Sequence, residues 1–356
     1  MTRTSLLAWV LVAVCSGCNF SQIVPPDQLE QTERGTFTAS GRYFLVGVRP
    51  EGRPDAGGWL VEITKNATGG YSTHNVVRAF MEGTVDGTFN GAPAGEPCFF
   101  SGMAIRGEVV YASCVSFADL RSSLLEIDLT TRRVRAGYFT SCNFEPSAQP
   151  CQATLHYPNG MAIDAAGRIY VSDSIAHLSE IAGELVGETA GAHTLTQITI
   201  DRAASQGTTL AFKHRAWLDN DIFSDGFAPN GVQIEGDILY YVAGWNINKV
   251  RILPDGRAGE VRVHYEGPLL GTGDDFAIYE GRIVLARVIT PALVALEAAG
   301  FNARAREIDS YDVPLEAVPS AVAYQPPNPP RGRIFPKDSL VVTSFFGGGL
   351  YVLSKR

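Results

Sequence analysis

Positive charge is scarce in this sequence of 356 residues. Lys and Arg number 29 against 37 Asp and Glu, which gives a formal net charge of −8 at pH 7. Because nucleic-acid binding depends on Lys and Arg contacts with phosphates, this balance argues against a nucleic-acid partner. Methionine is also rare, with four residues, whereas 37 Gly and 20 Pro interrupt the chain, so long helices are not expected. A hydrophobic content of 45% excludes a disordered chain.

Long hydrophobic runs are missing as well, except at the N-terminus. Leu6–Val14 is an apolar run preceded by one charged residue, Arg3. This pattern indicates a signal peptide over residues 1–17, too short to cross a bilayer. The sequence up to Cys18 resembles the lipobox of bacterial lipoproteins, so Cys18 is expected to carry lipid and to anchor an exported protein at the outer membrane. The alternative is ordinary cleavage nearby and release of the exported protein.

No CxxC pair follows the signal segment, which argues against a zinc site. The four remaining cysteines are an even number in an oxidising compartment, so two disulfides are expected. A hairpin turn near residues 106–107 would bring Cys98 close to Cys114, and a short loop separates Cys142 from Cys151. We therefore expect the pairs Cys98–Cys114 and Cys142–Cys151. The alternative is four buried free thiols.

The body of the chain is a repeat. Its units share a first apolar strand, a Gly-containing turn and a second strand that ends in small residues. The clear copies are 101–114, 159–174, 230–244 and 274–288, with weaker copies at 33–48 and 320–345. Two further apolar runs follow most copies, which gives four short strands in each unit. Six units predict an all-β six-bladed β-propeller, with four-stranded antiparallel blades around a central channel, over residues 30–356.

Two details of this propeller can be anticipated. Residues 18–29 are expected to serve as a tether and closure strand beside residues 349–354, because closing the ring removes exposed strand edges. The segment 177–227 is expected to be an insertion with strands near Thr194–Ile200 and Thr209–Leu218 and with loops over one face. A pair of β-sandwiches is the alternative, but it would not explain why each unit opens in the same way.

In a propeller the first strand of each blade lines the channel, so the opening positions of the repeats should face the axis at one height. These positions are Glu33, Ser101, Asn159, Asn230, Asp274 and Ser320. Most of them carry carboxylate or amide oxygens, with Asp275 adjacent, and none carries sulfur or imidazole. Such hard donors suit calcium, which accepts neutral carbonyl oxygens more readily than magnesium does. The alternative is that each Asn simply forms a turn.

The segments Tyr157-Pro158-Asn159-Gly160, Pro229-Asn230-Gly231 and Gly273-Asp274-Asp275 resemble the superfamily of gluconolactonases, senescence marker protein, strictosidine-synthase-like proteins and paraoxonases. The resemblance covers nearly all of residues 30–356 and implies a six-bladed propeller with a channel calcium. By position it implies as ligands Glu33, Asn159, Asn230, Asp274 and Asp275. Asp275 departs from the paraoxonase pattern, which has an amide there. Arg34 and Gly160 replace the acids that hold a second, structural calcium, so that ion is not expected.

A further departure concerns activity. Ser101 stands where paraoxonases have a catalytic His, and residues 113–117 contain no partner His. The resemblance to gluconolactonases therefore makes Asp274 the candidate base, with calcium polarising the carbonyl of a small ester or lactone. Ser101, Asp173 and His156 are candidates for supporting or substrate-binding roles. The alternative function is a non-catalytic propeller that binds a ligand or protein and has a structural calcium. A cluster of acids at 219–225 is expected to be a solvated loop.

Overall fold

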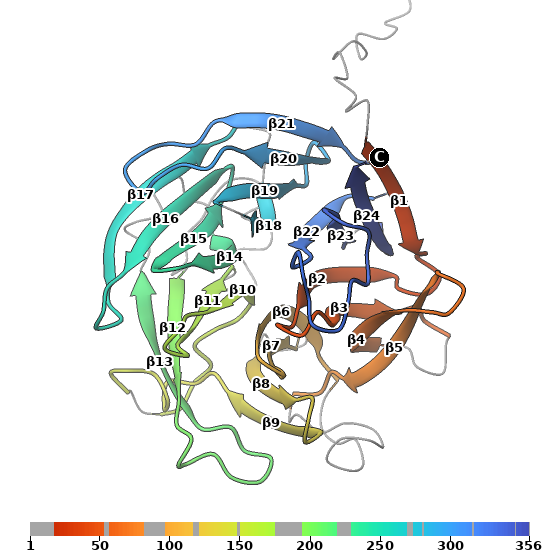
Figure 1. The fold of residues 1–356 in the computed structure, drawn as a ribbon. Coiled ribbons are helices and arrows are strands. Elements are labelled where there is room, and N and C mark those ends of the chain that lie inside the picture. Colours follow the sequence, from red (N-terminus) through yellow and green to blue (C-terminus); the bar gives the residue numbers. More distant parts are fainter. Residues whose placement is uncertain are drawn as a thin grey trace, which may run out of the picture.

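The computed structural model describes most of the chain after the signal segment. The described ranges are 18–52, 57–81, 97–116, 121–147, 150–174, 194–218, 229–268, 273–279, 281–314, 317–345 and 347–355. These residues form strands and loops arranged as six four-stranded sheets around one axis (Figure 1). The prediction of an all-β six-bladed propeller is confirmed. Within the described ranges, no helix is long and apolar enough to span a bilayer.

Each of the first three blades runs outward in chain order from a first strand at the channel. Their strands are β2 (Gln31–Phe37), β3 (Tyr43–Arg49), β4 (Gly57–Lys65) and β5 (Tyr71–Arg78); β6 (Phe99–Arg106), β7 (Val109–Val115), β8 (Ser122–Asp128) and β9 (Arg133–Tyr138); and β10 (Pro158–Ile163), β11 (Ile169–Asp173), β12 (Thr194–Ile200) and β13 (Phe212–Leu218).

Two further blades repeat this order, and the last is completed by the N-terminal strand. Their strands are β14 (Pro229–Glu235), β15 (Ile238–Ala243), β16 (Asn246–Ile252) and β17 (Ala258–Glu266); β18 (Gly273–Tyr279), β19 (Arg282–Arg287), β20 (Ala292–Leu296) and β21 (Glu307–Asp312); and β22 (Pro319–Tyr324), β23 (Leu340–Ser344), β24 (Leu350–Lys355) and β1 (Cys18–Val24).

The ring closes through the pairing of β1 with β24. This ladder is antiparallel and joins Phe20 to Leu353 and Gln22 to Tyr351. It covers the outer edge of β24, as the sequence suggested, so the last blade has four strands like the others. Since its strands come from both ends of the chain, the closure links the first and last parts of the sequence without a covalent bond.

The described part of the segment 177–227, residues 194–218, is a regular part of a blade. Its two strands, β12 and β13, are the third and fourth strands of the sheet that begins with β10. The two expected strands are confirmed, but their assignment to an insertion was wrong, because a long connection separates them in sequence from the first strands of their blade. Residues 175–193 and 219–228 lie outside the described residues, and with them His177, His193 and the acids Asp219, Asp221 and Asp225.

Stacking of neighbouring blades builds the core. Each of the six apolar clusters among the described residues draws its side chains from two adjacent blades. Inner strands are therefore buried on both faces and are almost wholly apolar, as in β7, whereas the outermost strand β21 faces solvent and reads Glu-Ile-Asp-Ser-Tyr-Asp. This layering keeps the first strands rigid around the channel.

Both predicted disulfides are confirmed. Cys98, just before β6, pairs with Cys114 in β7, and their Cα atoms lie 5.7 Å apart. Cys142 pairs with Cys151 across a short loop, with Cα atoms 5.0 Å apart. The hairpin that joins β6 to β7 turns at Gly107, whose φ of 64° favours glycine.

Candidate metal centre

The first strands of the six blades surround the channel in the order β22, β2, β6, β10, β14 and β18 (Figure 1). A cavity of about 270 Å³ lies at the end of the channel where these strands begin. Its lining residues are Glu33, Tyr157, Asn159, Asn230, Gly273, Asp274, Val288, Ile289 and Phe345. Four of the predicted positions, from four different blades, therefore meet in one cavity.

A β-bulge in each first strand turns these residues toward the channel. Between Pro158 and Met161, two residues of β10 stand opposite the single residue Ser172 of β11. The same register shift occurs at Glu33 in β2, Asn230 in β14 and Asp274 in β18, and a related shift occurs at Ser101 and Ser320. A bulge bends its strand and re-aims a side chain. The candidate ligands thus lie at one height along the channel because the same backbone bulge is repeated from blade to blade.

The glycine after each Asn serves close packing between blades. A Cβ atom on Gly160 would overlap the carbonyl oxygen of Asn230, and one on Gly102 would overlap that of Asn159. Gly231 meets Asp274 and Asp275 of the next blade in the same way. The Asn-Gly pairs therefore lie in bulged strands and not in turns, so the simple turn interpretation of these pairs is wrong.

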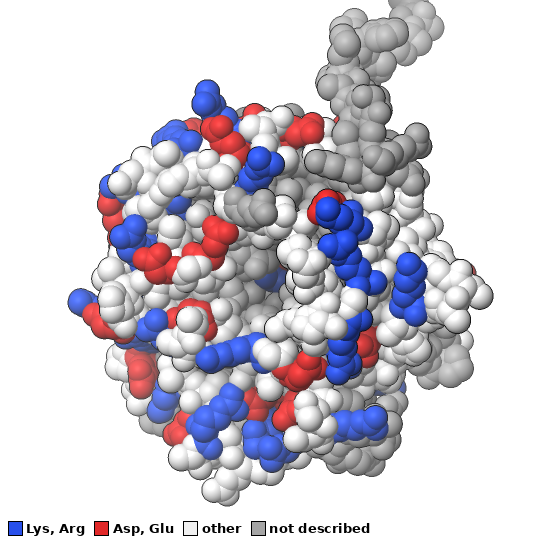
Figure 2. All heavy atoms as spheres, in the orientation of Figure 1, with Lys and Arg blue, Asp and Glu red and all other residues white. Residues whose placement is uncertain are grey.

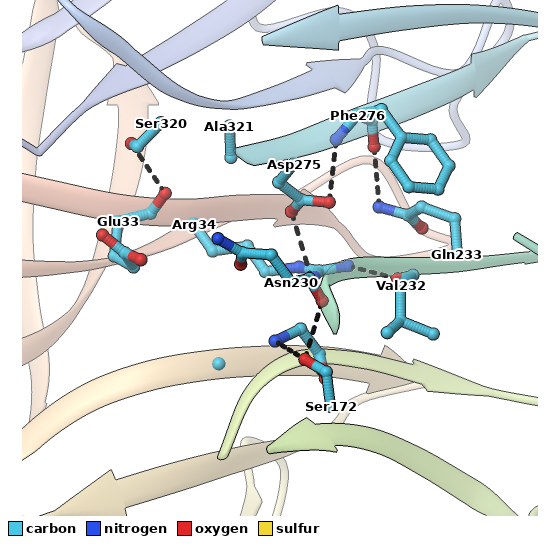
Figure 3. A network of polar contacts seen from close by, with 12 residues as sticks. Glu33, Arg34, Ser172, Asn230, Val232, Gln233, Asp275, Phe276, Ser320 and Ala321 are labelled. Atoms are coloured by element: carbon cyan, nitrogen blue, oxygen red, sulfur yellow. Dashed lines mark hydrogen bonds and ion pairs between the residues drawn. The ribbon is translucent and has the colours of Figure 1, made fainter. Parts of the chain in front are cut away.

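Hydroxyl groups hold the backbone of the candidate ligands from the neighbouring blade. Ser172 Oγ accepts a hydrogen bond from Gly160 N at 2.7 Å and donates one to Asn230 O at 2.7 Å. Ser320 Oγ donates to Glu33 O at 3.0 Å (Figure 3). Ser101 belongs to this group: its buried hydroxyl donates to Pro158 O and does not line the cavity. Ser101 is placed as a support for the strand of Asn159.

The carboxylates of the cavity are buried and repel one another. Burial and the nearby charge of Asp275 raise the pKa of Asp274 to about 7, although a hydrogen bond from Asn230 and the charge of Arg34 act in the opposite direction. Burial raises the pKa of Glu33 well above its usual value, and the charges of Asp274 and Asp275 add to the increase. The ionised forms of Glu33 and Asp274 are therefore unfavourable in the folded protein, and a bound cation would stabilise them.

Asp275 is turned away from this cavity and contacts Arg34. Its Oδ2 lies 3.1 Å from Arg34 Nη1, and both side chains are almost fully buried (Figure 3). Its Oδ1 accepts a hydrogen bond from Phe276 N at 2.8 Å. In the described part of the chain, no three His, Cys, Asp or Glu side chains come close enough to hold a metal by themselves. A metal here would thus depend on the amide oxygens of Asn159 and Asn230.

The remaining candidates lie beside the cavity. Asp173 is buried and accepts hydrogen bonds from the backbone N–H groups of Tyr157 at 2.9 Å and His156 at 3.4 Å. It therefore fixes the segment that leads into Asn159. The His156 side chain is partly buried and is not among the residues that line the cavity.

Several lining residues were not predicted as site residues. The Tyr157 phenol lines the cavity, and burial together with the charges of Glu33 and Asp274 raises its pKa well above the usual value. Val288, Ile289 and Phe345 form an apolar wall, and Ile289 is 59% exposed. Tyr157 stands within the motif that carried the resemblance, so its position was a usable signal. The apolar wall comes from loops after second strands, where no repeat pattern marks it.

Fold and site together define a six-bladed β-propeller whose channel holds a cavity with oxygen donors on one part of its lining and an apolar wall on another. No family model and no curated protein matches the sequence. Solved structures share the fold: streptogramin B lyase (TM-score 0.50, 9% identity, 96% of this chain and 98% of that one) and the PQQ-bound aldose sugar dehydrogenase of Streptomyces coelicolor (0.51, 12%, 97% and 100%). A candidate 6-phosphogluconolactonase of Bacteroides uniformis ATCC 8492 is also similar (0.50, 12%, 87% and 77%). At such identities the likeness concerns the fold alone.

Proposed function

We propose that this protein is a calcium-dependent hydrolase of small esters or lactones, with its site in the channel cavity. The observation that carries the proposal is the meeting of Glu33, Asn159, Asn230 and Asp274 from four blades in one cavity. These residues fit calcium by their chemistry, since they offer only hard oxygen donors and two mutually repelling carboxylates. The membership of enzymes among proteins of this fold is consistent with the proposal.

The chain's own groups have distinct tasks in this reaction. When bound, calcium would supply Lewis-acid polarisation of the substrate carbonyl. Asp274 accepts a proton from the attacking water and returns it to the leaving alkoxide oxygen when the ester bond breaks. Tyr157 stays protonated and offers a hydrogen-bond donor at the cavity wall. Val288, Ile289 and Phe345 contact the apolar part of the ester, which favours substrates with an alkyl or aryl group.

A panel of lactones and aryl esters tests this function. Turnover should require calcium, disappear after chelation and return on addition of CaCl₂. Asp274→Asn should lower kcat by about 10²-fold or more, which is the usual contribution of a general base. The matched control Asp309→Asn changes an exposed acid of the outer strand β21 and should leave kcat unchanged. Calcium-independent turnover, or full activity of Asp274→Asn, would refute the mechanism.

One observation favours a second function, a non-catalytic ligand-binding propeller. Among the described lining residues there is no His, Ser or Cys, so these residues supply neither a His base nor a Ser or Cys nucleophile. In that case calcium would raise thermal stability by binding the folded state. The same panel would then show ligand-dependent stabilisation without turnover.

We also propose that Cys18 is lipidated and attaches the propeller to the outer membrane. The strand β1 begins at Cys18, so the lipid would join the last blade directly, without an intervening linker. Two or more acyl chains give stable anchoring. Cys18→Ser should move the protein from the membrane fraction to the soluble fraction, and unchanged fractionation would disprove the attachment.

A further inference from the structure

Arg34 departs from the pattern of the first strands. In the other five blades the residue after the channel-facing position is small in four, namely Gly102, Gly160, Gly231 and Ala321, and is Asp275 in the fifth. In β2 the same position carries the longest cationic side chain. Arg34 is nevertheless only 5% exposed, so its guanidinium is accommodated inside the molecule.

The Arg34 side chain spans the channel. Its strand, β2, stands opposite β14 in the ring, yet Arg34 Nη2 donates a hydrogen bond to Val232 O of β14 at 3.0 Å. Arg34 Nη1 contacts Asp275 of β18 at 3.1 Å. Figure 3 shows the guanidinium between these two strands, next to Asn230. A positive charge is thus fixed beside the candidate ligands by partners from two other blades.

The charged side chains around the channel leave a net charge that matches one divalent cation. Glu33, Asp274 and Asp275 bring three negative charges when ionised, and Arg34 brings one positive charge that cannot be removed near neutral pH. The remainder is two negative charges, the amount that one divalent cation neutralises. Asp275 is already engaged by Arg34, so the two uncompensated acids are Glu33 and Asp274, which both line the cavity.

We propose that Arg34 is a built-in cation that sets the affinity of the cavity for a single calcium ion. It does so by neutralising Asp275 and by keeping that carboxylate out of the ligand set. The inference rests on the calcium site proposed above. It assigns Asp275 an indirect role, because its charge acts on the cavity only together with Arg34. Arg34 and Asp275 are therefore positioning residues and contact neither the substrate nor the ion.

Calcium calorimetry on a double-mutant cycle tests this role. Arg34→Met leaves three negative charges and should bind calcium at least tenfold more tightly than wild type. Asp275→Asn leaves a single negative charge and should bind at least tenfold more weakly. The double variant restores the wild-type balance, so its affinity should lie within about threefold of wild type. Arg42→Met is the matched control, because Arg42 lies at the far end of the same blade and pairs there with Glu62 of that blade and Glu108 of the next one.

The affinities of the variants test the role of Arg34, and the affinity of the wild type tests the calcium site. Wild-type affinity in Arg34→Met, or a double variant as weak as Asp275→Asn, would overturn the inference and make Asp275 a direct ligand in the second case. If Arg34→Met does not fold, the calcium affinities of Asp275→Asn and of the double variant still test the inference. The double variant changes both partners of the buried pair together. Absence of calcium binding to wild type would overturn the calcium site itself, and this inference with it.

Discussion

At the scale of single residues, the main feature of the cavity is its buried carboxylates, whose ionised forms are unfavourable without a metal ion. The pKa of Asp274 is raised to about 7 by burial and by Asp275, whereas an unfolded Asp titrates near pH 3.9. Between these values the folded protein holds a proton that the unfolded chain has released. Stability without metal must therefore fall as pH rises through this window. The same carboxylate becomes a better cation ligand over the same range, since it loses the competing proton.

This linkage gives a measurable pH dependence. Without divalent cations, the Tm of the wild type should fall between about pH 4 and pH 7, and saturating calcium should reduce that fall. Asp274→Asn should weaken the dependence, although Glu33 keeps part of it because its pKa is raised as well. Asp255→Asn is the control: hydrogen bonds from Arg257 lower the pKa of this exposed acid, so it does not titrate in the window. Thermal unfolding of Asp274→Asn with the wild-type slope would contradict the account.

At the scale of the strand, the bulge and its hydroxyl support determine where the ligands lie. Ser172 stands opposite the bulge of β10 and bonds to Gly160 of that strand and to Asn230 of the next blade. One hydroxyl thus links two candidate-ligand strands. Thr343 supports the backbone of Glu33, since its hydroxyl donates to Glu33 O at 2.9 Å. The blades are therefore joined at the height of the site by hydrogen bonds as well as by apolar packing.

Removal of one such hydroxyl should affect stability and metal binding together. Ser172→Ala would leave a buried N–H and a buried C=O unpaired, which costs about 1–3 kcal/mol of unfolding free energy. Calcium affinity should fall as well, because Asn230 loses its support. In Ser123→Ala, the removed hydroxyl is buried in β8 without a hydrogen-bond partner among the described residues, so the change should be nearly neutral. Denaturant unfolding and calcium titration measure both effects; equal stabilities of the two variants would disprove the role of Ser172.

At the scale of the whole molecule, the repeat made the fold predictable. The sequence contains six copies of one strand-turn-strand unit, with glycine at turns such as Gly107, and two cysteine pairs that are close in sequence. All of these features depend only on residues that are near one another in the chain. The shared position of Glu33, Asn159, Asn230 and Asp274 followed from the repeat, since equivalent residues of successive blades lie at one height.

Contacts between distant parts of the chain could not be predicted in this way. The bulges depend on strand register, which the residue pattern alone does not specify. The pairing of Asp275 with Arg34 joins β18 to β2, two first strands that are not neighbours in the ring, so neither local sequence points to the other. Loop residues such as Ile289 enter the cavity through chain geometry that carries no periodicity. For the same reason β12 and β13 were interpreted as parts of an insertion and not as the outer strands of a blade.

A crystal structure of the purified protein grown with CaCl₂ tests the central claim most directly. The account predicts one calcium ion in the channel cavity, with oxygens of Glu33, Asn159, Asn230 and Asp274 at about 2.3–2.6 Å from it. It also predicts that Asp275 still contacts Arg34. An empty cavity at saturating calcium, or an ion held elsewhere without these four side chains, would contradict the account.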